Sequence, residues 1–195
     1  MEIELPGPFI ENKKRSRAEL ELLLIQPGSH EVPPCQNCRE HIVSQCNAKC
    51  ANAPKALSSD PERYPVESRV VPLVYELRKT RVMQPCWSCE GHMDADGKLW
   101  KYPQVSFYSP TPLYAVLLVN YLTLLKHHKK LYHDWNIIIS GFGQKHSVIT
   151  YTIEPKLSAY APPHLGRLHC DLTTIAENLE FHIKQEARKM LDVLN

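Results

Sequence analysis

Apolar residues recur at three- and four-residue steps in several parts of the chain, which is the pattern of amphipathic helices. The helices predicted in this way span residues 17–24, 66–77, 111–132 and 168–194. Pro72 either kinks the second helix or marks its start. Asn120 and Thr123 interrupt the apolar run of the third helix, which is far shorter than the ~20 apolar residues of a membrane span. We therefore expect a buried helix there and no membrane contact.

Three shorter segments have the composition of β-strands, and their order along the chain predicts the fold class. The segments span residues 105–109, 135–140 and 147–153, and the last two form a hairpin. A stretch with two cysteines and a turn at 94–97 comes before the first strand. The sequence predicts an α+β fold: a small sheet of about three or four strands packed with helices, plus a cysteine-rich metal-binding knuckle.

Composition changes along the chain and suggests three regions. Residues 1–30 have an irregular start and one short helix, and we expect an N-terminal appendage. Residues 31–62 hold four cysteines and little apolar periodicity, and we interpret them as a metal-binding segment. Residues 63–195 carry the regular pattern of an α+β domain.

Overall composition limits the environment and the partners that we expect. Of the 195 residues, 43% are hydrophobic and the net charge is only +2, so a protein partner is favoured over nucleic acid. Glu2 and Glu4 occupy positions where a secretory signal would be basic or apolar. We therefore expect a cytoplasmic chain, in which reduced cysteines act as ligands or catalysts and do not form disulfides.

Six of the seven cysteines are paired by their spacing. Cys35 and Cys38 form a Cys-x2-Cys pair, Cys46 and Cys50 a Cys-x3-Cys pair, and Cys86 and Cys89 a second Cys-x2-Cys pair. A tight turn between such cysteines can direct both thiolates at one cation, with zinc–sulfur distances of about 2.3 Å. The spacing predicts a metal centre and favours zinc.

Two assignments of the ligands are open. In the first, Cys35, Cys38, Cys46 and Cys50 form a closed tetrahedral site, while Cys86, Cys89 and His92 form a second site with an open position. In the second, the 35/38 and 86/89 pairs share one ion. His41 could replace a thiolate in the first cluster.

The segment from Cys86 to His92 carries the candidate chemistry. We expect Gly91 to permit a backbone turn that brings His92 toward the thiolates. Glu90 is the candidate general base if the metal activates water, or else a residue that steadies His92 or a backbone amide. Both cysteine pairs that follow a proline resemble half of a zinc deaminase signature, but the required His-x-Glu is absent from the sequence.

Three functional hypotheses follow from these patterns. The first is a zinc-binding intracellular protein that acts as a binding or regulatory module. The second is a metal-dependent enzyme with Cys86, Cys89 and His92 as ligands and Glu90 as general base. The third is a thiol redox or iron–sulfur protein, although the cysteine intervals match neither ferredoxin pattern. Cys170 stands alone and is interpreted as an ordinary core residue.

Overall fold

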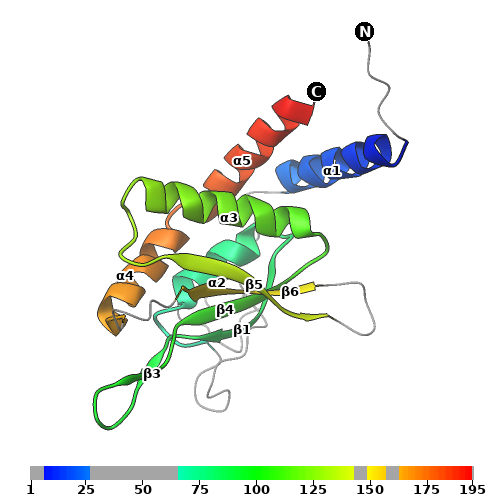
Figure 1. Ribbon diagram of the computed structural model, residues 1–195. Helices are drawn as coiled ribbons and strands as arrows, with labels where there is room; N and C mark the ends of the chain where they lie inside the picture. The colour runs from blue at the N-terminus through cyan, green and yellow to red at the C-terminus, as the bar shows by residue number, and fades with distance from the viewer. Residues whose placement is uncertain (1–6, 27–65, 143–148, 157–162, 195) are drawn as a thin grey trace, which may run out of the picture.

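A computed structural model describes residues 7–26, 66–142, 149–156 and 163–194 of the chain (Figure 1). These residues form five helices and two antiparallel sheets, so the predicted α+β class is confirmed. The helices are α1 (Gly7–Ile25), α2 (Val71–Lys79), α3 (Pro112–His127), α4 (Leu165–Ala176) and α5 (Leu179–Leu194). The strands are β1 (Gln84–Cys89), β2 (His92–Met93), β3 (Leu99–Lys101), β4 (Gln104–Ser109), β5 (Trp135–Phe142) and β6 (Ile149–Pro155).

The larger sheet has the strand order β1-β4-β6-β5, and all neighbouring strands in it are antiparallel. The smaller sheet is the β2–β3 hairpin, which projects from the larger one (Figure 1). Its turn is closed by Asp94, whose Oδ1 accepts hydrogen bonds from the backbone amides of Asp96 and Lys98. Gly97 completes the turn with a φ of +76°, a conformation that glycine adopts at little cost.

One face of the larger sheet packs into a core that it shares with all five helices. Val105 and Phe107 of β4 lie opposite Ile153 and Tyr151 of β6, and these alternate positions are all buried. Each helix adds residues to the same cluster, among them Leu20, Leu23, Leu73, Leu117, Leu172 and Ile183. Burial of this apolar area is the main stabilisation of the fold.

Local signals explain where several helices begin and end. Pro72 stands in the first turn of α2, so it marks the start of that helix, one of the two interpretations left open by the sequence. The side chain of Thr111 accepts a hydrogen bond from the Leu113 amide and caps α3.

The C-terminal region forms two helices, α4 and α5, and the prediction of one helix from 168 to 194 was wrong. The chain breaks at Asn178, whose φ of 55° is in the left-handed region. Asparagine tolerates that conformation better than most residues, but apolar periodicity does not report it.

Two further elements differ from the sequence-based expectations. Helix α1 begins at Gly7, earlier than predicted, and its Leu20 and Leu23 are fully buried in the common core. Residues 84–89, interpreted as part of a knuckle, form the edge strand β1.

The predicted domain boundaries stay predictions, and residues 31–62 lie outside the described part of the chain. Among the described helices, none combines the length and apolar character needed to cross a membrane.

Candidate metal centre

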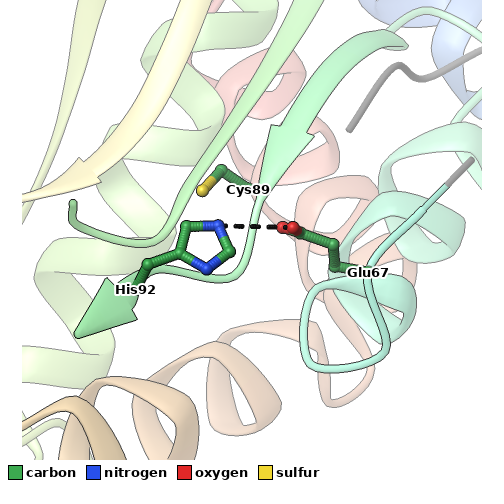
Figure 2. A group of neighbouring side chains, drawn as sticks. All are labelled: Glu67, Cys89 and His92. Carbon is green, nitrogen blue, oxygen red and sulfur yellow. Dashed lines mark ion pairs between the residues drawn. The ribbon is translucent and has the colours of Figure 1, made fainter. Parts of the chain in front are cut away.

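Three side chains from separate segments bring potential metal ligands together (Figure 2). They are Glu67 from the turn before α2, Cys89 at the end of β1 and His92 at the start of β2. One donor atom from each, a carboxylate oxygen, the thiol sulfur and a ring nitrogen, all lie within 4.8 Å of one another. Glu67 and Cys89 are buried, whereas about a third of the His92 side chain is exposed. The group could hold a metal ion at the edge of the core.

Glu67 is held in place by the segment that it faces. Its Oε2 accepts a hydrogen bond from the backbone amide of Glu90 at 2.7 Å. Its Oε1 lies 3.3 Å from Nε2 of His92. The turn that carries Glu67 leads directly into α2, and within it the Val70 amide donates a hydrogen bond to the Glu67 carbonyl oxygen. The position of the carboxylate therefore depends on the position of the helix.

Cys89 and His92 meet because the chain turns sharply at Gly91. Gly91 has a φ of +87°, which confirms the turn expected from the sequence. A Cβ at this position would lie 2.8 Å from the Cδ atom of Pro103 and 2.9 Å from Leu165, so there is also no room for a larger residue. The Gly91 amide donates a hydrogen bond to the sulfur of Cys89 at 3.4 Å, so the turn also orients the thiol.

The orientation of His92 is set by the hairpin. Its ring stacks on Trp100, with the ring centroids 5.8 Å apart and an interplanar angle of 26°. The 3.3 Å between its Nε2 and the Glu67 oxygen is the distance of an ion pair, and two ligands of one metal ion have a similar separation.

Glu90, the candidate general base, supports the turn that carries Glu67. Its Oε2 accepts hydrogen bonds from the Arg69 amide at 2.9 Å and from the Ser68 hydroxyl at 3.4 Å. The Glu90 carbonyl oxygen in turn contacts Nε2 of His169 in α4 at 2.8 Å. Glu67 and Glu90 thus form a reciprocal clasp between the two segments, which favours the interpretation of Glu90 as a positioning residue.

Cys86, a predicted ligand, is not one of the three converging side chains. It lies at an irregularity of β1, where the register with β4 shifts between Pro85 and Trp87. Burial raises the pKa of the Cys86 thiol above 9.0, and a side-chain hydrogen bond with Tyr108 offsets part of that rise. A raised pKa lowers the thiolate fraction at neutral pH, which argues against Cys86 as a redox nucleophile.

The other predicted ligands are not placed by the structure. Cys35, Cys38, Cys46 and Cys50 lie outside the described residues, as does His41. Whether Cys86 and these cysteines bind a metal stays a prediction.

Cys170 differs from its interpretation as a core residue, because the structure exposes it on α4. Helix α4 buries Leu168, Asp171 and Leu172 on the side that faces the core. Cys170 is not at a position on that side, so it is exposed. Cys170 is therefore exposed and far from Cys89 in the sequence, whereas Cys89 is buried.

Sequence reasoning missed Glu67. It lies twenty-two residues before Cys89 (89 − 67 = 22), and no spacing rule connects a single carboxylate in a turn to a distant cysteine. The only local signal was its place just before a helix that begins with a proline.

The chemistry of the group suits a divalent cation. A thiolate and a carboxylate together supply two negative charges, and a neutral imidazole supplies a third lone pair. Cysteine, histidine and an acid can also form a nucleophile–base–acid triad, but a triad uses both ring nitrogens. Here a single ring nitrogen is near both other donors, and Cys89 is fully buried, so the arrangement favours cation binding.

Comparison of the chain with models of known protein families, with curated proteins and with solved structures found no match.

Proposed function

We propose that the protein binds zinc and acts as a binding or regulatory module. In this proposal Glu67, Cys89 and His92 hold the metal. The observation that carries the proposal is the convergence of three lone-pair donors from three separate segments within 4.8 Å. Two of the three are buried, so the donors are removed from most of the competing water.

Zinc is the cation that best suits this mixed donor set. Calcium and magnesium prefer oxygen ligands throughout, and a thiolate suits a softer cation. Zinc accepts sulfur, nitrogen and oxygen together in tetrahedral sites. The two negative charges of the ligands would balance the charge of the ion.

A metal at this position would act on the architecture around it. It would join the turn before α2, the end of β1 and the β2–β3 hairpin, three segments that now meet through the Glu67–Glu90 clasp and the turn at Gly91. Such a cross-link is typical of structural zinc, which contributes directly to folding. The near-neutral charge of the chain supports a protein partner over nucleic acid.

The cysteines at 35, 38, 46 and 50 are proposed as a second, closed site on the basis of their spacing alone. A chain with both sites would bind two zinc ions. A chain in which the 35/38 and 86/89 pairs share one ion would bind one, so the stoichiometry separates the two assignments.

The alternative proposal is a metal-dependent enzyme with Glu90 as general base. A site with three protein ligands leaves a position for water, as in catalytic zinc centres. The hydrogen bonds that Glu90 accepts from Arg69 and Ser68 support a positioning role over that of a base. A water molecule that coordinates the bound metal and exchanges with the solvent would favour the enzyme.

The test is metal binding by the full chain with Cys89→Ser and, as a matched control, Cys170→Ser. Zinc content is measured per chain, and cobalt substitution reports thiolate coordination through the sulfur-to-metal charge-transfer band. Cys89→Ser should lose one metal equivalent, because a direct ligand is removed. Cys170→Ser should equal the wild type, because that thiol is exposed on α4. Equal zinc content and equal cobalt spectra for Cys89→Ser and wild type would refute the proposal.

A further inference from the structure

A concave feature lies between the β2–β3 hairpin and the start of α4. It is a cleft of about 730 Å³. This volume is within the range of about 300–1,000 Å³ that is usual for small-molecule sites. The hairpin contributes Met93 and Leu99, and the start of α4 contributes Leu165, so apolar side chains stand on both walls.

The cleft has one charged side chain, that of Lys98. His164 and His169 also line it, and among the described residues that line it none is acidic. Asp94 belongs to the same hairpin turn but does not line the cleft, and its Oδ1 accepts the backbone amides of Asp96 and Lys98. Within the described residues, the Lys98 ammonium has no ion pair, so its charge is available to a ligand.

The hydrogen bonds of His164 define what it can offer a ligand. Its Nδ1 accepts a hydrogen bond from the Gly166 amide at 3.2 Å, where it caps α4. In the neutral ring, the proton is therefore on Nε2, which is a donor. Lys98 and His164 consequently offer donors to a ligand, and an anionic group is the chemical complement of this pair.

We infer that this cleft binds a small organic molecule with an apolar body and a single carboxylate. Met93, Leu99 and Leu165 contact the apolar body, and Lys98 pairs with the carboxylate. Charge complementarity and volume carry the inference, which does not depend on the proposed metal. The cleft nevertheless adjoins the metal centre, because Leu165 packs against Gly91 and His169 contacts the Glu90 carbonyl oxygen.

The test uses two probes of nearly identical shape, 1-naphthylacetate and the uncharged 1-naphthylacetamide, titrated calorimetrically into the full chain. The wild type should bind the carboxylate about 2- to 5-fold more tightly than the amide, because a charge pair with an exposed lysine makes a modest contribution to affinity. Lys98→Gln should reduce carboxylate binding to the level of the amide. Met93→Ala should weaken both probes by a similar factor, since it removes part of the apolar wall.

Lys101→Gln is the matched control for charge. Lys101 is on the same hairpin, but its ammonium lies 5.0 Å from the centre of the Trp87 ring and it does not line the cleft. This variant should retain the preference for the carboxylate. Equal affinity of the wild type for the two probes, no binding of either, or an equal effect of Lys101→Gln and Lys98→Gln would overturn the inference.

Cys89→Ser separates this inference from the proposed function. It should lose metal while still binding 1-naphthylacetate, since the thiol is not part of the cleft. A wild type that binds metal but not the probe would reject the cleft alone. A wild type that binds the probe but no metal, or a Cys89→Ser variant that keeps the full metal content, would reject the metal centre alone.

Discussion

Two polar clusters of this protein each contain a buried carboxylate and a histidine, but the groups around the two carboxylates differ in kind. Asp171 of α4 is 1% exposed and accepts hydrogen bonds from the amides of Tyr132 and His133 and from the indole of Trp135. It also contacts Nδ1 of His133 at 2.9 Å. Glu67, in contrast, shares its site with a thiol sulfur and with a ring nitrogen of His92.

The difference indicates what each cluster does. Around Asp171, N–H donors converge on one acceptor, so the charge is compensated by the protein and the cluster joins α4 to the start of β5. Around Glu67, one carboxylate oxygen accepts the Glu90 amide, while the other lies near a ring nitrogen of His92 and the group also includes the Cys89 sulfur, so that a cation could be held there. We therefore interpret the first cluster as a structural anchor and the second as a metal centre.

The largest expected effect is that of Asp171→Ala on stability. This substitution leaves three buried or half-buried N–H groups without their acceptor and should cost about 3–5 kcal/mol. The free energy of unfolding, measured with urea, should fall by the same amount with zinc and with a chelator. A loss that appears only in the presence of zinc would contradict the assignment of Asp171 as an anchor.

Gly91→Ala should have the next largest effect and should affect both fold and metal. The positive φ and the contacts with Pro103 and Leu165 should together cost about 2–4 kcal/mol, and the displaced His92 should bind metal more weakly.

Gly97→Ala is the matched control for that substitution. Gly97 has a φ of +76°, but a Cβ there meets nothing within 4 Å, so only the conformational cost of about 1 kcal/mol is expected. Thermal unfolding and zinc titration of both variants provide the measurement. Equal losses for the two variants would show that close packing at Gly91 is not required.

Glu67→Gln should separate metal binding from folding. The amide oxygen of glutamine can still accept the Glu90 amide, so the stability of the chelated protein should change by less than about 1 kcal/mol. Zinc affinity should fall at least about 10-fold, because a charged ligand is lost. A competition titration with a chromophoric chelator measures the affinity. Unchanged affinity would exclude Glu67 from the coordination shell.

The smallest expected effect concerns the reactivity of Cys86. Because burial raises the pKa of this thiol, its rate of alkylation should reach a plateau at a higher pH than that of an ordinary thiol. Zinc should protect Cys89 and leave the exposed Cys170 reactive. Mass spectrometry after timed alkylation resolves the three sites. Fast alkylation of Cys86 at neutral pH would revive the redox hypothesis.

The sequence predicted the parts of the site that depend on local chain geometry. The spacing of Cys89, Gly91 and His92 indicated a turn between two ligands, and the structure contains that turn. Glu67 could not be found in this way, because only the folded arrangement of the turn before α2 and the end of β1 brings it to the site.

The elements of the fold were predictable where apolar residues are concentrated, as in α3 and β5. The strand β1 was missed because its Cys-x-x-Cys motif is associated with turns. Pairing with β4 stabilises it as a strand, and such long-range pairing leaves no periodic signal in a six-residue segment.

The most direct test follows the imidazole nitrogen resonances of His92 and His133 by NMR during a zinc titration of the full chain. With stoichiometric zinc, the His92 resonances should shift because a ring nitrogen coordinates the ion. The His133 resonances should remain unchanged because its Nδ1 stays with Asp171. Unshifted His92 resonances in excess zinc, or equal shifts for both histidines, would contradict the assignment of one cluster to metal binding and the other to the fold.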